Sequence, residues 1–323
     1  MKKFIRLFFI FFFNILLFSI LLLVIDYLVV MKEYNIYEKS INDSGYKGKE
    51  HIKGRPFEYN LKMNVYRSVS EMINYKDSRR IVNPGFEKRP IILYGCSYAY
   101  GDFLDDRQTF GNKLSLQTSR PVYNFAYSGW GLQHMYFQLE NENGVYSQIN
   151  NPEYAIYVFM GDHIHRMHYH YLGLASGGNQ LGYEKKGNKL IKKVPFFIQL
   201  NRLNFLKKIE ENFIFKHYTL NPSKQDENFD LMKAYFIQSK LKLSEIYPDI
   251  KFLIIKYPYP HCNQWYYSTP RWKELDQAGF IVVDLKEMLK EDLLTDEYRL
   301  PDEHPNEKAW DTIVPELIKK IKL

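Results

Sequence analysis

The chain has 323 residues, a formal net charge of +7 and a hydrophobic fraction of 46%. A chain of this length buries most of its apolar surface in a core, and this hydrophobic fraction excludes a disordered protein. Its lysines are scattered among acidic residues and form no compact basic stripe with interleaved aromatic rings. Nucleic acid is therefore excluded as a partner.

An almost unbroken run of Phe, Ile, Leu and Val covers residues 7–30. At about 1.5 Å per residue, a helix of this length spans a hydrocarbon core of about 30 Å, and no small-residue cleavage site of a signal peptide follows it. Three basic residues in 1–6 favour a cytoplasmic N-terminus. The sequence predicts a single-pass protein of the cytoplasmic membrane, with the rest of the chain on the periplasmic or extracellular side.

Residues 31–88 have no sustained periodicity, which predicts a stalk and an irregular lead-in. In the remaining part, 89–323, five short apolar runs predict buried strands. These runs are 91–94, 122–125, 155–159, 251–255 and 280–283. Segments with helical spacing lie between or after them, at 109–117, 132–139, 231–246 and 310–321. The alternation predicts an α/β domain of three layers (α/β/α) around a central, mostly parallel five-stranded sheet, with an insertion at about 178–226.

Ser97 follows the most apolar of these runs, in the sequence Gly95-Cys96-Ser97. This position is the turn between a strand and a helix at the carboxyl edge of the sheet, where open α/β sheets bind ligands. A serine there exposes its hydroxyl, and the backbone N–H groups at the helix start, including that of Ser97, stabilise an oxyanion. A serine at a strand end is, by itself, more often a helix N-cap.

The second chemical element is Asp302-Glu303-His304, which lies between two prolines just before the last helical segment. A carboxylate two residues before a histidine is able to accept a hydrogen bond from Nδ1 and leave Nε2 free as a base. The alternative is a loop in which Asp302 merely caps the helix. Together, Ser97, Asp302 and His304 supply the nucleophile, the acid and the base of acyl transfer in that chain order.

These elements resemble the blocks of the SGNH, or GDSL-like, hydrolase family over residues 89–323. Block one matches as Gly95-Cys96-Ser97, with Cys96 in place of the usual Asp, and block two matches over 124–131. The resemblance implies an SGNH/flavodoxin-like fold and an acyl-ester hydrolase that forms an acyl-enzyme on Ser97. It also implies that Gly129 gives a backbone N–H to the oxyanion hole, where Gly129 alternatively serves only a tight turn.

Block three departs from the family, because residues 160–166 contain no asparagine to complete the oxyanion hole. Asp162 is a poor substitute, since an ionised carboxylate repels a developing negative charge. Either His163 or Arg166 donates instead, or the hole has only its two backbone donors. We expect Asp162, Arg166 and Trp130 to contact the substrate.

The spacing of Asp302 and His304 resembles that of SGNH-like proteins that O-acetylate bacterial exopolysaccharides. The expected substrate is therefore an acylated carbohydrate, or another ester, of the cell envelope. One alternative is an O-acetyltransferase of surface polysaccharide, which needs an acyl-donor partner in the membrane. Another is a catalytically weak protein that only binds glycans.

Four histidines lie close together beside Asp162: they are His163, His165, His168 and His170. A metal-dependent hydrolase is the third alternative, ranked last because the cluster lacks the longer separations of zinc motifs. A polar loop lining the site explains it equally well, so we expect neither a metal nor another cofactor. Cys96 and Cys262 are expected to be free thiols.

Overall fold

We describe the protein from a computed structural model. The described residues are 11–14, 17–18, 21 and 81–323, the last range without 84, 128, 142–145, 147–148, 168–182, 188, 193–224, 260–263 and 290–291. Within the predicted transmembrane segment 7–30, the few described residues are helical and exposed. No helix among the described residues is long and apolar enough to cross a membrane. The remainder of that segment and the predicted stalk up to residue 80 lie outside the described residues.

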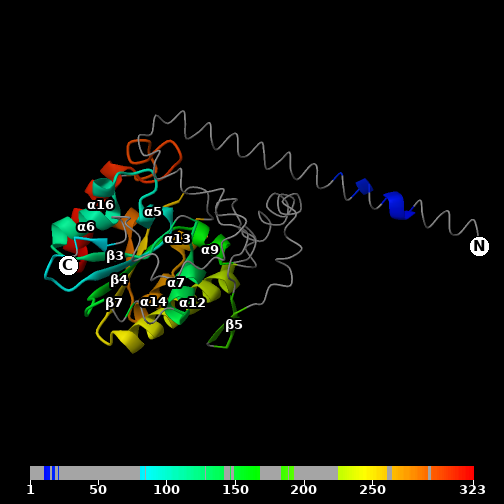
Figure 1. The fold of residues 1–323 in the computed structure, drawn as a ribbon, viewed down its shortest axis with the longest axis horizontal. Helices are drawn as coiled ribbons and strands as arrows, with labels where there is room; N and C mark the ends of the chain where they lie inside the picture. Colours follow the sequence, from blue (N-terminus) through cyan, green and yellow to red (C-terminus); the bar gives the residue numbers. More distant parts are fainter. Residues whose placement is uncertain are drawn as a thin grey trace, which may run out of the picture. The chain divides into compact units, whose positions relative to one another are not determined.

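A six-stranded sheet forms the centre of the domain, in the order β1-β3-β2-β4-β7-β8 (Figure 1). Its strands are β1 (Ile81–Val82), β2 (Ile91–Tyr94), β3 (Val122–Asn124), β4 (Tyr154–Phe159), β7 (Lys251–Lys256) and β8 (Ile281–Asp284). Five neighbouring strands of this sheet are parallel, in the order β3-β2-β4-β7-β8, which confirms the predicted sheet. The additional strand β1 pairs antiparallel with β3. Since β1 lies within the predicted lead-in, the sheet begins before the predicted domain boundary at 89.

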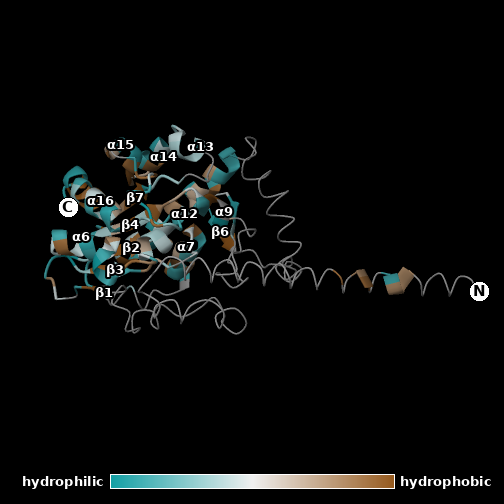
Figure 2. Ribbon diagram, turned by 90° about the horizontal axis from the view of Figure 1, so that it is seen from above, coloured by the Kyte–Doolittle hydropathy of each residue, from teal (hydrophilic) through white to brown (hydrophobic). Residues whose placement is uncertain are grey.

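Helices cover both faces of the sheet, as predicted for three layers. They are α5 (Ser97–Tyr100), η1 (Asp106–Gln108), α6 (Phe110–Thr118), α7 (Leu132–Asn141), α9 (Asp162–Arg166), α12 (Gln225–Ile246), α13 (Trp265–Ser268), α14 (Trp272–Gln277), α15 (Leu285–Met288) and α16 (Glu307–Ile321). Ile91 and Leu93 pack with α6 and α16, whereas Ile92 and Tyr94 pack with α7, α12 and α14, because successive side chains of a strand point to opposite faces. Figure 2 shows the strands between these two helical layers.

Part of the predicted insertion at 178–226 is a two-stranded antiparallel sheet of β5 (Tyr183–Lys186) and β6 (Lys189–Lys192). Tyr183 and Leu190 are buried in the same cluster as α7 and α12, and the Tyr183 ring lies 5.0 Å from that of Tyr136. This hairpin therefore packs on the domain. Of the predicted insertion, 178–182, 188 and 193–224 lie outside the described residues.

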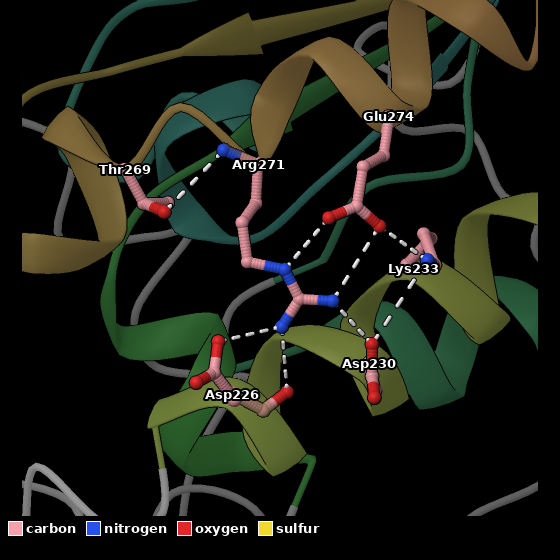
Figure 3. A network of polar contacts seen from close by, with 6 residues as sticks. All are labelled: Asp226, Asp230, Lys233, Thr269, Arg271 and Glu274. Carbon is pink, nitrogen blue, oxygen red and sulfur yellow. Dashed lines mark hydrogen bonds and ion pairs between the residues drawn. The ribbon is translucent and has the colours of Figure 1, made fainter.

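A network of charges joins the start of α12 to α14 (Figure 3). The Arg271 guanidinium contacts Asp226 at 2.9 Å, Asp230 at 2.5 Å and Glu274 at 2.7 Å, and it lies 4.6 Å from the centre of the Phe229 ring. Hydrogen bonds from Arg271, and then from Lys233, lower the pKa of Glu274 to about 2. Arg271 therefore fastens two helices that cover the same face of the sheet.

We expect Arg271→Ala to lower the free energy of unfolding by about 1–2 kcal/mol, because this network is partly exposed to solvent and is screened by salt. The measurement is urea unfolding at pH 7. Arg271→Lys should recover little, since an ammonium does not reproduce the forked contacts. The matched control is Lys242→Ala, which removes an exposed ion pair between Lys242 and Glu245 on α12. It should change the free energy of unfolding by less than about 0.5 kcal/mol.

The same variant has a predictable pH dependence. The folded-state pKa of Glu274 is depressed, so its contribution is present above its ordinary pKa of 4.5 and is lost as the pH falls toward about 2. The difference in stability between wild type and Arg271→Ala should therefore shrink across this window. A difference that stays constant down to pH 2 would contradict the assigned role of Glu274.

Candidate active site

The chain turns sharply between β2 and α5, and Ser97 is the first residue of this helix. Gly95 makes the turn possible: its φ is +149°, and a Cβ there would lie 2.8 Å from the Ala99 Cβ. The helix N-cap is Cys96, so Ser97 does not serve as the N-cap. Ser97 thus lies at the carboxyl edge of the sheet, as predicted, with 6% of its surface exposed.

Cys96 stands where the family that the sequence resembles has an aspartate, and its side chain is fully buried. It is a free, buried cysteine, as expected, with its Sγ 3.2 Å from the Met160 Sδ. Burial raises the pKa of the thiol, so the group is an uncharged packing residue beneath the turn. Cys262 lies outside the described residues.

His304 is carried by a tight hairpin turn. The Glu303 N–H donates to the Leu300 carbonyl, and the Leu300 N–H donates to the His304 carbonyl, both at 2.8 Å. This is the pattern of a three-residue hairpin loop, whose third residue is left-handed. Glu303 occupies that position with a φ of +70°. Pro301 stands at the second position of the turn, where its fixed φ is favourable.

Asp302 and His304 form the predicted pair. The Asp302 Oδ2 lies 3.0 Å from the His304 Nδ1, and the Asp302 Oδ1 accepts a hydrogen bond from the His304 backbone N–H at 3.3 Å. Burial lowers the pKa of His304, but the close contact with Asp302 and the charge of Asp302 raise it by more, so that the pKa lies above its usual value. Asp302 thus holds Nδ1 and stabilises the protonated imidazole.

The structure brings the turn of Ser97 and the loop of His304 to the same place. The ring of Tyr98, the residue after Ser97, lies 5.2 Å from the His304 ring, and its hydroxyl donates to the Glu303 carbonyl at 3.0 Å. Phe103 contacts the same imidazole at 5.3 Å. No direct hydrogen bond between Ser97 and His304 is present among the described contacts, and such bonds are often long before substrate binds.

Gly129 lies in the turn that follows β3, with a φ of +77°. This turn is attached to the nucleophile turn, because the Tyr127 N–H donates to the Gly95 carbonyl at 3.3 Å. The neighbouring Gly131 N–H is engaged by the His134 Nδ1 at 3.1 Å. The backbone N–H groups of Ser97 and Gly129 have no such partner within the described part of the chain.

Asp162 and Arg166 form an ion pair one helical turn apart on α9. The Arg166 Nε and Nη2 lie 2.8 and 2.6 Å from the Asp162 Oδ2, and both residues are buried. The Arg166 Nη1 donates to the Trp130 carbonyl at 2.8 Å. The guanidinium therefore links block three to the turn that carries Gly129. Its charge also acts to lower the pKa of His304.

His163, the other expected donor, is fully buried. Its Nδ1 lies 3.0 Å from the Tyr157 hydroxyl, and its ring packs edge-on against Phe159. Burial, followed by the charges of Arg166 and His134, places its pKa well below the usual value, so the ring is neutral. The role of His163 in the oxyanion hole stays a prediction. The side chain is not exposed in this position, so it does not face a substrate.

The histidine cluster gives no support to a metal site in the part of the chain that is described. His168, His170 and the side chain of His165 lie outside it. The described residues contain no group of three or more His, Cys, Asp or Glu arranged to hold a metal ion.

Trp130, expected at the substrate site, is half-buried and stacks on the His134 ring at 5.2 Å, with an angle of 3° between the planes. The half-buried Tyr127 ring lies 5.4 Å from Trp130. Sequence reasoning missed Tyr127, His134, Tyr98 and Phe103. The only signal was their closeness to the motifs, because aromatic residues are also common in cores.

No family model and no curated protein matches the chain. Among solved structures, a family two carbohydrate esterase from Clostridium thermocellum is 12% identical with a TM-score of 0.42, and an acetyl xylan esterase from Butyrivibrio proteoclasticus is 9% identical with a TM-score of 0.42. In both cases the match covers 73% of this chain but only 64% of the other, less than two thirds of that protein.

A protein described as lipolytic, of the G-D-S-L family, from Desulfitobacterium hafniense is 12% identical with a TM-score of 0.39. This match covers 72% of this chain and 99% of the other. Likeness at this level says nothing about activity or substrate.

Proposed function

We propose that the protein is a serine-dependent acyl-ester hydrolase, an esterase or deacetylase, with Ser97 as the nucleophile. The observation that carries this proposal is the Asp302–His304 pair at 3.0 Å, on a loop that is hydrogen-bonded to the residue following Ser97. A carboxylate-held imidazole next to a serine at the carboxyl edge of a sheet is the arrangement that acyl transfer requires.

The reaction has two halves. The His304 Nε2 takes the proton of Ser97 while Oγ forms a bond to the ester carbonyl carbon. His304 then returns this proton to the alcohol oxygen as the carbon–oxygen bond breaks. Water then gives a proton to His304 as its oxygen attacks the acyl carbon. The bond between the acyl carbon and the Ser97 Oγ breaks, His304 returns the proton to Oγ, and the acid is released. A sugar hydroxyl in place of this water would make the protein a transferase, and no described contact favours that acceptor.

Arg166 is the third donor of the proposed oxyanion hole, beside the N–H groups of Ser97 and Gly129. Asp162 stands in the block where the family has its asparagine, and Arg166 neutralises it through two contacts to one oxygen. The guanidinium is bonded to the same turn as Gly129 and is positively charged under all relevant conditions. A fixed positive group near the carbonyl oxygen stabilises the tetrahedral intermediate.

An acylated carbohydrate is the substrate class that fits this site best. Tyr127 and Trp130 are half-buried rings in the turn that carries Gly129. Aromatic rings stack on the apolar faces of sugars through their own faces. A sugar held there would present its acyl group next to Ser97.

We also propose that residues 7–30 anchor the protein in the cytoplasmic membrane, with the domain on the periplasmic or extracellular side. The unbroken apolar run and the basic N-terminal flank support this location. The full-length protein should stay in the membrane fraction after washing at alkaline pH. External protease should digest the domain in cells whose membrane is intact, and protection from protease would contradict the proposed orientation.

The nucleophile and the base are testable with a fluorophosphonate probe on the full-length protein. We expect the wild type to be labelled covalently and Ser97→Ala and His304→Ala to lose at least about 1000-fold in labelling rate, because the serine is activated by the base. The matched control is Ser115→Ala, a buried serine of α6 outside the site. Unchanged labelling of Ser97→Ala would refute the assignment of the nucleophile.

The labelling rate should rise with pH as His304 loses its proton, because only the neutral imidazole acts as a base. Since the pKa of His304 lies above its usual value, the midpoint should exceed about 6.5, the value of an unperturbed imidazole. Asp302→Asn removes the larger of the two carboxylate contributions that raise this pKa, the other being that of Asp102, and the midpoint should move down. The same pH midpoint in Asp302→Asn and in wild type would argue against the Asp302–His304 pair.

The role of Arg166 is testable by hydrolysis of an acetyl ester. Arg166→Ala should lower kcat by about 100- to 1000-fold, the usual effect of losing one oxyanion donor. The double variant Asp162→Asn/Arg166→Ala places an uncharged donor where the family has one, and it should recover part of the loss. Circular dichroism checks that both variants fold. Full activity of Arg166→Ala would contradict its role as the third donor, and the oxyanion hole would then consist of the two backbone N–H groups alone.

A further inference from the structure

The hairpin loop of His304 contains a backbone conformation that its sequence does not favour. Glu303 has a φ of +70°, in the left-handed region that glycine and asparagine enter readily and glutamate avoids. The third position of such a loop normally carries glycine. The loop must therefore be held in place by contacts from outside itself.

One such contact comes from the nucleophile turn. The Tyr98 hydroxyl donates to the carbonyl of Glu303, the residue with the unfavourable φ, at 3.0 Å. Tyr98 is 4% exposed and directly follows Ser97 in α5. The same side chain packs against the His304 ring. A single residue thus connects the segment of the nucleophile with the segment of the base.

A second residue of the nucleophile segment shows the same pattern. Phe103 lies just after α5, has a φ of +63°, and contacts the His304 ring at 5.3 Å. Left-handed non-glycine residues persist only where the surroundings hold them, and they gather at functional sites. Here two of them, Phe103 and Glu303, lie on the two segments that meet at His304.

We propose that Tyr98 is a positioning residue, which fixes the His304 loop relative to Ser97 through its hydrogen bond to the Glu303 carbonyl. This inference rests on the proposed function of Ser97 and His304. The physical reason is that proton transfer demands close placement: a displacement of about 1 Å costs roughly 100-fold in rate. Asp302 orients the imidazole within its own loop, whereas Tyr98 places the whole loop.

Tyr257 provides a matched control for this inference. Its buried ring packs edge-on against Tyr98 at 5.1 Å, but its hydroxyl has no hydrogen-bond partner among the described residues. Tyr98→Phe and Tyr257→Phe therefore remove the same atom from neighbouring rings. Only the first removes a bond to the base loop.

The test compares the fluorophosphonate labelling rates of the full-length variants. Tyr98→Phe should be labelled about tenfold more slowly than wild type, the effect of losing one hydrogen bond from the reacting geometry, and Tyr257→Phe should be labelled at the wild-type rate. The pH midpoint of labelling should be the same in all three, because the Asp302–His304 pair stays intact. Equal rates for Tyr98→Phe and wild type, or equal losses in both variants, would overturn the proposal.

Rescue by Glu303→Gly separates positioning from a merely structural role. Glycine adopts the left-handed conformation without cost, so the loop no longer needs the bond from Tyr98. The double variant Tyr98→Phe/Glu303→Gly should recover most of the labelling rate, as a coupling between the two sites requires. Additive losses would show that Tyr98 only stabilises the fold, and would overturn the proposal.

Hydrogen exchange of the backbone amides of Leu300 and of residues 302–304 tests the inference without any reaction, since Pro301 has no amide hydrogen. Exchange there should be about tenfold faster in Tyr98→Phe than in wild type and in Tyr257→Phe. If wild type is not labelled by the probe at all, the proposed function fails, and this exchange experiment still decides whether Tyr98 holds the loop. Unchanged exchange in Tyr98→Phe would overturn the positioning role.

Discussion

The candidate site depends on how β2 ends. All residues of this strand, up to its last residue Tyr94, are buried. The burial fixes the register and the direction of the strand within the sheet. The chain then turns at Gly95, where a Cβ would lie 2.8 Å from the Ala99 Cβ and 3.2 Å from the Val158 carbonyl oxygen of the neighbouring strand. The position of Ser97 at the sheet edge is therefore determined by the packing of the residues that precede it in the chain.

The base reaches the same edge by a different route. The Asn306 Oδ1 accepts from the Ala309 N–H at 3.0 Å and starts α16, whose apolar face is buried beside α6. The hairpin of His304 is thus attached to a helix that packs on the same side of the sheet as the nucleophile segment. These two segments, far apart in the sequence, meet because both pack into one hydrophobic cluster. The hydrogen bond from the Tyr98 hydroxyl to the Glu303 carbonyl joins them directly.

Much of this arrangement was predictable from the sequence, and the exceptions have physical causes. Buried parallel strands are continuous apolar runs, which is why all five were found. Strand β1 has only two residues, too few for any periodicity, and the β5–β6 hairpin is rich in lysine. Asp302 and His304 were predictable because they interact within one loop. The contact of Tyr98 with Glu303 was not, since it joins residues far apart in the chain and depends on the backbone conformation of Glu303.

The pair of Asp162 and Arg166 shows how a buried carboxylate determines the charges around it. A buried asparagine needs hydrogen-bond partners but no charged one, whereas a buried aspartate is costly unless a positive group compensates its charge. Arg166, four residues later on the same helix, lies in the position where an i,i+4 partner reaches the carboxylate. The compensating group brings in several N–H donors and a permanent charge. A bond to the Trp130 carbonyl holds the guanidinium against the turn of Gly129, and the proposed role of Arg166 as an oxyanion donor rests on this placement.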